Sequence, residues 1–322
     1  MSKISVSNMK SERNKTIDIS VKEGKAYLDK CLTQKDKSRF DHENIIINGD
    51  TFEILPFIKD KSVDLLVVDP PYNLTKRFGG MNFKKTDTDS YAEYTRKWLE
   101  AVLPKLKSGA SVYVCCDWQS SMVIGNVLAE YLTVRNRITW QREKGRGAAA
   151  NWKNGMEDIW FATVSDEYTF NLDAVKIRKK VVAPYKENGK PKDWEETAEG
   201  NFRNTCPSNF WDDISIPYWS MPENTTHPTQ KPEKLIAKLI LASSNEGDTV
   251  LDIFAGSGTT PVTAKKLGRK YIAIELDKQY CIFAQKRLEM AEQDASIQGF
   301  SDGVFWERNS FSSQRKTKSK NA

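Results

Sequence analysis

The hydrophobic pattern of this chain alternates between short apolar runs and longer stretches with helical spacing. The plainest run is residues 63–68, which is apolar apart from Asp64 and ends at Asp69. A continuous run of this kind predicts a strand that is buried on both faces, as in a parallel sheet. Further runs predict strands at 45–47, 111–117, 135–141, 157–163, 168–171, 249–252 and 271–274. Apolar residues at helical spacing predict helices at 26–32, 51–58, 91–106, 122–132, 233–243 and 278–291.

Strands and helices alternate along most of the chain, which predicts an α/β fold with a doubly wound, mostly parallel sheet. Residues 1–40 and 173–226 interrupt this alternation. We expect a loosely packed arm from the first segment and an irregular insertion from the second. The predicted organisation is an N-terminal arm, a first half of the α/β domain, an insertion, a second half and a polar, basic tail, at 1–40, 41–172, 173–226, 227–292 and 293–322.

Composition indicates the cellular compartment and the kind of partner to expect. The formal charge of +6 and the pI near 8.8 suggest an anionic partner. The five cysteines include an adjacent pair but no C-x-x-C, which argues against a disulfide framework and against a zinc site. No apolar run approaches the roughly 18 residues of a membrane helix. We therefore expect a soluble, cytoplasmic protein without a metal ion or a membrane segment.

The end of the run at 63–68 carries the first candidate chemistry. Asp69 stands at the carboxyl end of the predicted strand, where open α/β sheets bind ligands. Pro70 and Pro71 lack a backbone N–H, which leaves the carbonyls of Asp69 and Pro70 as outward acceptors. With the flat ring of Tyr72, these groups can hold a planar base by its exocyclic amine. The structural alternative is a strand end that is simply closed by a Pro-Pro turn.

A second predicted strand ends in a loop of small residues. Asp252 closes that strand, and Gly256 and Gly258 follow in a loop where a ligand can approach the backbone. The loop is neither G-x-G-x-x-G nor a Walker sequence, because no lysine follows the glycines. The next strand ends at Glu275, and an acid at that place is the usual partner of ribose hydroxyls. Asp50 also ends a predicted strand, although an aspartate there can simply cap the following helix.

Two segments combine basic and aromatic residues. Between residues 135 and 153, six Lys or Arg stand against one acid, and the insertion has basic clusters among Trp194, Trp211 and Trp219. Cations interleaved with aromatic side chains are typical of nucleic-acid surfaces. An ordinary insertion whose tryptophans pack on the core is the alternative. The candidate phosphate contacts are Arg142, Lys144, Arg146, Lys176, Arg178, Lys179, Lys180 and Lys186.

Three of these segments resemble the amino-methylating DNA methyltransferases. Asp69-Pro70-Pro71-Tyr72 is similar to the catalytic signature of that family, in the form typical of enzymes that methylate N6 of adenine. Residues 254–260 (F-A-G-S-G-T-T) resemble the cofactor loop, and residues 227–232 (H-P-T-Q-K-P) resemble a motif of the beta-ordered members. The order of catalytic strand, insertion and cofactor loop also resembles the beta arrangement.

The resemblance implies a Rossmann-like methyltransferase fold that uses S-adenosyl-L-methionine, with residues 173–226 as the target-recognition region. It implies direct in-line transfer of a methyl group to the N6 amine of an adenine flipped out of double-stranded DNA. The catalytic residues would be Asp69, Pro70, Pro71 and Tyr72. The cofactor contacts would be Asp50, Asp69, His227, Thr229, Lys231, Asp252, Phe254, Ala255, Gly256, Ser257, Gly258, Thr259, Thr260 and Glu275. A homodimer and a separate cognate restriction endonuclease are further partners that the resemblance suggests.

Other functions stay open at the level of sequence. Cytosine-N4 methylation presents a similar amine, although its signature usually begins with serine. RNA and protein-glutamine methyltransferases use N-P-P-Y-type sites. A DNA-binding module with a vestigial methyltransferase fold is the non-enzymatic alternative, and the intact Asp69, Tyr72, Gly256 and Glu275 argue against it.

Overall fold

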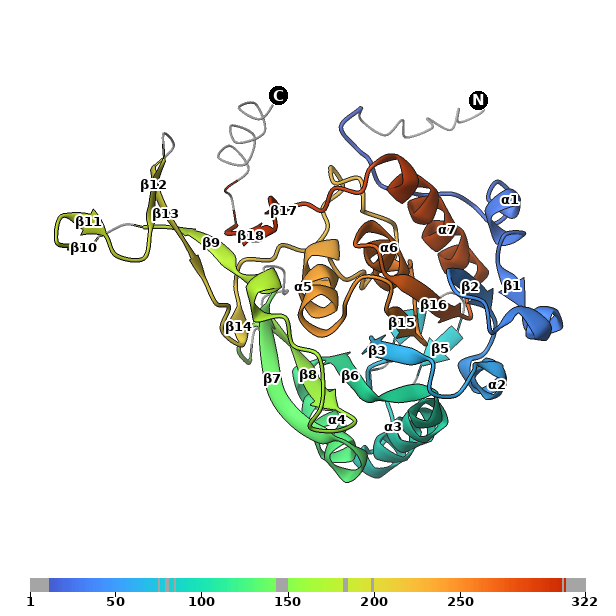
Figure 1. The fold of residues 1–322 in the computed structure, drawn as a ribbon. Coiled ribbons are helices and arrows are strands. Elements are labelled where there is room, and N and C mark those ends of the chain that lie inside the picture. Colours follow the sequence, from blue (N-terminus) through green and yellow to red (C-terminus); the bar gives the residue numbers. More distant parts are fainter. Residues whose placement is uncertain are drawn as a thin grey trace.

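The computed structural model describes residues 12–74, 76–78, 81–83, 85–142, 150–181, 185–197, 200–308 and 310. Figure 1 shows a central sheet with helices on both sides and a smaller sheet that projects from it. Within the described residues, the central sheet has nine strands. Their order is β1 (Leu32–Thr33), β2 (Ile45–Asn48), β16 (Lys270–Glu275), β15 (Thr249–Asp252), β3 (Val63–Val68), β6 (Leu106–Cys116), β8 (Met156–Thr163), β7 (Thr133–Gln141) and β14 (Phe210–Trp211).

The first six strands in this order run parallel to one another. β8 then pairs antiparallel with both β6 and β7, and β14 pairs parallel with β7. The prediction of a mostly parallel sheet is confirmed.

Side chains along β3 alternate between two apolar layers. Leu66 and Val68 face a layer covered by α2 (Thr51–Ile54), α3 (Thr88–Val102) and α4 (Trp118–Tyr131). Leu65 and Val67 face the other layer, which is covered by α5 (Glu233–Ser243), α6 (Thr259–Lys266) and α7 (Lys278–Gln293). Successive side chains of a strand point to opposite faces, so a strand between two helical layers needs a continuous apolar run.

Two of the predicted elements are wrong in detail. The helix predicted at 91–106 ends earlier, because α3 ends at Val102 and a 3₁₀ turn, η3 (Leu103–Lys105), leads into β6. Residues 168–171, predicted as a strand that could pair with the one at 157–163, form no strand. β8 cannot pair with them because both of its edges are already taken, by β6 and by β7.

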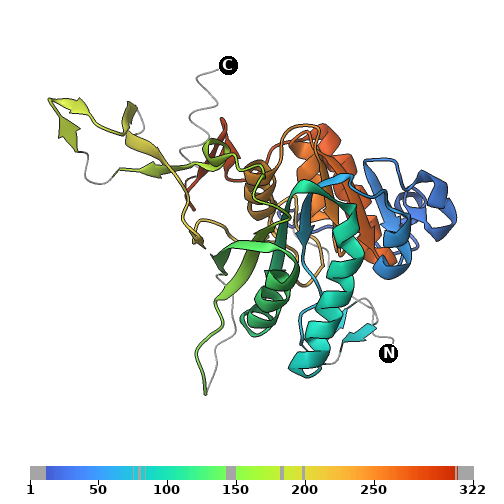
Figure 2. The same ribbon diagram turned by 60° about the horizontal axis from the view of Figure 1, so that its bottom comes forward.

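The insertion forms strands of a second sheet rather than an irregular surface. β9 (Ile177–Lys180) lies between β13 (Gly200–Thr205) and β18 (Val304–Trp306), with β12 (Glu195–Thr197) and β17 (Phe300–Ser301) at the edges. A hairpin of β10 (Lys186–Glu187) and β11 (Lys190–Pro191) extends beyond this sheet, away from the central one (Figure 2). Because β17 and β18 follow residue 292, part of the predicted polar tail pairs with the insertion. Residues 311–322 lie outside the described residues.

The N-terminal segment is tied to the core, although the sequence predicts a loosely packed arm. β1 extends the central sheet beside β2, and Phe40 is fully buried. α1 (Lys25–Leu28) lies against α7, and a 3₁₀ turn, η1 (Gln34–Arg39), follows β1. Further upstream, Ile17 forms a bridge with Thr225, just before the motif at 227–232. The N-terminal segment therefore supports both the second half of the α/β domain (227–292) and the loop that carries this motif.

The remaining short elements are η2 (Leu55–Phe57), η4 (Leu172–Val175) and an antiparallel pair, β4 (Lys76–Phe78) and β5 (Met81–Phe83). No helix in the described part of the chain is long and apolar enough to cross a membrane. All five cysteines are free thiols, and four of them are buried. Among the residues with described positions, no group of three or more His, Cys, Asp or Glu is arranged to hold a metal ion.

Gly258 should not tolerate a side chain, because it precedes α6 with a φ of +78° and faces α7. A Cβ there would lie 2.4 Å from the Cβ of Ala284. We expect Gly258→Ala to lower the free energy of unfolding by about 2–4 kcal/mol, through overpacking and the left-handed backbone. Urea denaturation measures the loss. Gly247→Ala is the matched control, since its φ is +84° and nothing lies within 4 Å of its Cβ. Equal losses in the two variants would mean that the contact with α7 has no cost.

Candidate active site

Asp69 and Asp252 follow two neighbouring strands, although they are far apart in the sequence. β3 and β15 are parallel, with Leu65 opposite Val250 and Leu66 opposite Leu251. The carboxyl ends of both strands therefore meet at one edge of the sheet. Open α/β sheets bind their ligands at this edge.

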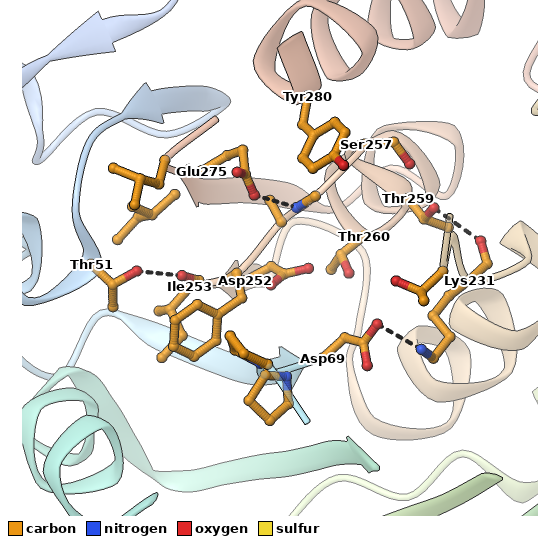
Figure 3. A pocket seen from close by; sticks show the side chains of 18 of the residues that line it. Thr51, Asp69, Lys231, Asp252, Ile253, Ser257, Thr259, Thr260, Glu275 and Tyr280 are labelled. Carbon is orange, nitrogen blue, oxygen red and sulfur yellow. Dashed lines mark hydrogen bonds and ion pairs between the residues drawn. The ribbon is translucent and has the colours of Figure 1, made fainter. Parts of the chain in front are cut away.

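A cavity of about 370 Å³ opens at this edge, which is a size typical of small-molecule sites. Figure 3 shows that its side chains come from both halves of the chain. The predicted residues that line it are Asp50, Asp69, Pro70, Pro71, Tyr72, His227, Thr229, Lys231, Asp252, Phe254, Ala255, Gly256, Ser257, Thr259, Thr260 and Glu275. Gly258 does not line it and packs on Ala284, so its missing side chain serves the contact between α6 and α7 rather than ligand approach.

Two acids lie at the ends of β15 and β16, the buried Asp252 and the half-buried Glu275. Glu275 accepts the backbone N–H groups of Gly256 and Asp277, both at 2.7 Å. Burial raises the pKa of Glu275 to about 7, although these two hydrogen bonds oppose the rise. Burial also raises the pKa of Asp252 to about 7, while its carboxylate accepts the N–H of Phe254 at 3.0 Å. Such acids are stabilised in the charged form by hydroxyl donors or a cation, so the cavity suits a ligand that brings both.

Asp50 both caps α2 and lines the cavity. Its Oδ1 accepts the backbone N–H of Phe52 at 2.8 Å. The capping role and the binding role of this residue are therefore compatible. Phe52 and Tyr94 line the cavity as well, with ring centroids 6.3 Å apart. The sequence does not single out these two aromatic residues, because their only signal is an apolar position in an amphipathic helix, which is ordinarily a core position.

His227 is held in the cavity wall as a neutral imidazole. Its ring contacts that of Tyr280, with centroids 4.3 Å apart, and its Nδ1 accepts the N–H of Thr229 at 3.3 Å. Burial, together with the charge of Lys231, lowers the pKa of His227 to about 3. The histidine therefore shapes the wall and carries no charge at neutral pH.

Asp69 belongs to a buried network of polar groups. The Tyr72 hydroxyl donates to Oδ1 of Asp69 at 2.8 Å, and the Lys231 ammonium donates to Oδ2 at 2.6 Å (Figure 3 shows the second contact). The same ammonium lies 3.3 Å from Oε2 of Glu157, whose other oxygen pairs with Arg142. Burial and the charge of Asp69 raise the pKa of Tyr72 well above its usual value, so the hydroxyl stays protonated and can donate.

Glu157 is the member of this network that the sequence analysis misses. It is the second residue of β8, stands just before Asp158 and the apolar residues 159–162, and is only 3% exposed. Two acids at the start of a predicted buried strand are the one signal that could have found it. Arg142, predicted as a DNA contact, pairs with Glu157 instead. Lys231, predicted as a cofactor contact, lines the cavity but directs its ammonium to Asp69.

The other predicted DNA contacts lie mainly on the second sheet. Lys176, Arg178 and Lys179 each lie within ion-pair distance of an acid. The Arg178 guanidinium also lies over the rings of Phe202 and Trp306, so it has a packing role. Lys180 and Lys186 are exposed. Arg178, Lys179 and Lys180 stand in β9, and Lys186 stands in the hairpin that projects from the second sheet (Figure 1).

The tryptophans of the insertion divide into two groups. Trp194 and Trp211 are buried, at 7% and 6% exposed, whereas 52% of Trp219 is exposed. Packing on the core, the alternative considered from the sequence, therefore holds for Trp211. Trp194 is buried near the hairpin, where its indole N–H donates to the carbonyl of Tyr185. Lys144 and Arg146 lie outside the described residues.

The cavity fits the chemistry of S-adenosyl-L-methionine. The rings of Phe52 and Phe254 offer apolar surface for an adenine, and Glu275 stands where acids bind ribose hydroxyls in Rossmann-like folds. Asp252, which also lines the cavity, would place a carboxylate near a sulfonium. The residues that line the cavity therefore fit the chemistry of each part of the cofactor.

A Pro-Pro-Tyr turn after an acid, placed beside a cavity of this kind, defines the class of amino-methylating methyltransferases. The family model of a DNA methylase, N6_N4_Mtase, matches residues 63–286, and the chain belongs to this family of DNA methyltransferases. It is 33% identical over 262 residues to the Type II methyltransferase M.HpaI of Haemophilus parainfluenzae, which covers 79% of this chain and 76% of that protein. It is 34% identical over 262 residues to the DNA adenine methyltransferase YhdJ of Escherichia coli (strain K12), which covers 79% of this chain and 86% of that protein.

Solved structures share the fold. The complex of M1.HpyAVI with SAM has a TM-score of 0.53 at 24% identity and covers 76% of this chain and 98% of its own. The cytosine-N4-specific PvuII DNA methyltransferase has a TM-score of 0.54 at 16% identity and covers 78% of this chain and 92% of its own. The Rossmann-like methyltransferase fold is therefore confirmed.

Cofactor affinity should depend on pH through Glu275. Its pKa is raised to about 7 in the free protein, and hydroxyl donors favour the charged form. Affinity for S-adenosyl-L-methionine should therefore fall as the pH drops below 7, by up to about tenfold per unit for one proton. Isothermal calorimetry between pH 6 and pH 8 measures this slope. Glu275→Gln should bind more weakly at pH 8 and show a flatter slope than the wild type, because Asp252 alone would then titrate. Equal slopes in both proteins would remove the Glu275 carboxylate from the contact.

Proposed function

We propose that this protein transfers a methyl group from S-adenosyl-L-methionine to the N6 amine of adenine in double-stranded DNA. The observation that carries the proposal is the position of Asp69, which ends β3 beside the cofactor end of β15 and lines the same cavity. Asp69, as the acceptor for the amine, would therefore lie next to the cavity that would hold the methyl donor. Membership of the DNA methylase family and the similarity to an adenine methyltransferase support DNA and adenine as the targets.

In the proposed mechanism, the target adenine leaves the duplex, at a cost of roughly a few kcal/mol, and stacks on Tyr72. Asp69 and the carbonyl of Pro70 accept hydrogen bonds from its amine and draw the nitrogen lone pair out of conjugation with the ring. The carbonyl of Pro71 is engaged elsewhere, since it accepts the hydroxyl of Tyr91 at 3.1 Å. The cofactor supplies a methyl group on a positively charged sulfur, which is a good leaving group. The chain then contributes position and local charge.

The second sheet is the proposed DNA surface. Residues 176–194 carry seven Lys or Arg against two acids, and the projecting hairpin can follow a duplex beyond the cavity. Phosphate contacts of this kind fix orientation, and base contacts then read the sequence. Of Trp194, Trp211 and Trp219, Trp219 is the exposed one and is the insertion's candidate for such a base contact. A homodimer and a cognate restriction endonuclease remain predictions.

Cytosine-N4 transfer is the second candidate function, since the solved cytosine-N4 enzyme shares the fold. The aspartate at the start of the signature and the adenine-specific relative favour adenine. Long-read sequencing of DNA from cells that express this chain would report the modified base and its context together. Mass spectrometry of the nucleosides is the second measurement. N4-methylcytosine without N6-methyladenine would contradict the choice of adenine.

Asp69→Ala should abolish transfer while it largely preserves cofactor binding, because the acid acts on the amine. Loss of such an acceptor should cost about 3 kcal/mol or more in the barrier, which is at least a hundredfold in turnover. Tritium transfer from labelled cofactor measures turnover, and calorimetry measures binding. Asp64→Asn is the control, because it removes an acid from the opposite end of β3, where Asp64 pairs with Lys107. Turnover near the wild-type value in Asp69→Ala would remove Asp69 from the mechanism.

Replacing Lys179 and Lys180 with Ala should weaken binding to cognate and unrelated duplexes about equally. The salt dependence of affinity should flatten by about one unit per lost phosphate contact. Fluorescence anisotropy at several salt concentrations measures both effects. The matched control replaces Lys22 and Lys25, two exposed lysines beside α1, at the other end of the molecule (Figure 1). An unchanged slope in the first variant, or an equal change in the control, would mean that β9 is not the DNA surface.

A further inference from the structure

The ammonium of Lys231 is used entirely inside the site. Its acceptors are Oδ2 of Asp69 at 2.6 Å, the hydroxyl of Tyr72 at 3.0 Å and Oε2 of Glu157 at 3.3 Å. An ammonium has three N–H donors and no acceptor. Two of them donate to Asp69 and Tyr72, and Glu157 lies within ion-pair distance. Only 6% of the side chain is exposed. The Lys231 ammonium therefore has a defined position and does not face the solvent.

Two carboxylates contact this one ammonium, Asp69 after β3 and Glu157 in β8. Two like charges in a shared buried site disfavour each other, unless a cation lies between them. Burial opposes the charged form of Lys231, but the charges of Asp69 and Glu157 outweigh it and raise its pKa. The lysine is therefore protonated, and it balances one of the two acids.

Besides Lys231, Arg142 is the second cation of this network, since the other ionisable groups around the ammonium carry no positive charge. Burial raises the pKa of the Cys115 thiol well above its usual value, and the phenol of Tyr72 is shifted in the same direction. His227 is neutral, as described above, and Asp252 has a pKa of about 7. Arg142 pairs with the far oxygen of Glu157. At neutral pH the network next to the amine position thus contains two acids and two cations.

We propose that Lys231 is a positioning residue of the transfer step: its ammonium orients the Asp69 carboxylate and the Tyr72 hydroxyl toward the target amine and offsets the charge of Glu157. Tyr72 receives a hydrogen bond from Lys231 and gives its own to Oδ1 of Asp69, so both oxygens of Asp69 are anchored. An ionised carboxylate offers about four lone-pair positions, so the two anchoring bonds leave acceptors for the amine. This role rests on the proposed function, because it serves the amine that Asp69 would bind.

The backbone of Lys231 connects the same residue to the cofactor half. Its carbonyl accepts the hydroxyl of Thr259 at 3.0 Å, at the start of α6. One residue thereby holds the acceptor for the amine with its side chain and the first turn of the cofactor helix with its backbone. A side-chain substitution leaves the second contact available, so cofactor binding and amine positioning can be separated.

The test compares the pH profiles of single-turnover rates with saturating cofactor and DNA. In Lys231→Met, Asp69 and Glu157 lose their shared cation, so the acid limb of the profile should move to higher pH by about 1–3 units. The rate constant at pH 7 should fall about tenfold or more, as a shift of one unit already implies. Affinity for S-adenosyl-L-methionine, measured by calorimetry, should stay close to that of the wild type, because the ammonium contacts Asp69.

The double variant Lys231→Met with Glu157→Gln distinguishes charge from packing. It removes one cation and one acid together, so the charge balance around Asp69 is restored and the acid limb should return toward the wild-type position. A purely structural role of Lys231 predicts no such rescue. Lys234→Met is the matched control: Lys234 is also buried, but it pairs with Asp213, away from Asp69. It should lower stability without moving the acid limb.

A readout without catalysis separates this inference from the proposed function. Titration of the Asp69 carboxyl by carbon-13 NMR, with the resonance assigned from Asp69→Asn, should occur at higher pH in Lys231→Met than in the wild type, and the double variant should reverse this change. The inference would be overturned if Lys231→Met shifted neither the acid limb of the rate profile nor the titration of the Asp69 carboxyl. Absence of N6-methyladenine from wild-type reactions would instead overturn the proposed function, and the NMR titration would still decide the role of Lys231.

Discussion

The parallel pairing of β3 with β15 is the constraint on which the rest of the site depends. Each strand comes from a different half of the chain, and each ends in a loop with its own chemistry: Asp69 after β3 and the loop from Asp252 to Thr260 after β15. Backbone hydrogen bonds fix the register of the pair, so the two loops open at the same edge. No flexible segment has to bring the amine acceptor and the cofactor cavity together.

The buried charged side chains near this edge form ion pairs between residues that are far apart in the sequence. Lys231 contacts Asp69 and Glu157, and Lys234 and Lys238 contact Asp213 of the insertion. Buried ion pairs of this kind contribute little net stability, because desolvation offsets the attraction. Breaking one partner is costly, however, so each pair holds a specific geometry. The first group holds Asp69, and the second connects α5 with the segment that leads out of the second sheet.

The second sheet also explains why the insertion and the C-terminal strands belong together in space. β9 takes β13 on one edge and β18 on the other, so residues before and after the cofactor half share one hydrogen-bonded unit. The nearby residues Phe305 and Lys238 link this unit to α5. A DNA-facing surface built in this way would be held at a fixed distance from the cavity.

The sequence by itself determined the type of fold, the two strand-end motifs and most of the residues that line the cavity, because these depend on local patterns: continuous apolar runs, Pro-Pro after an acid and glycines after a strand. Only the tertiary structure decided what those residues contact. Gly258 packs on Ala284, Arg142 pairs with Glu157, and Trp211 is buried opposite Trp140 of β7, since each contact depends on a segment distant in sequence. Glu157 reaches Lys231 only because β8 lies beside β6, an antiparallel pairing that no local pattern specifies.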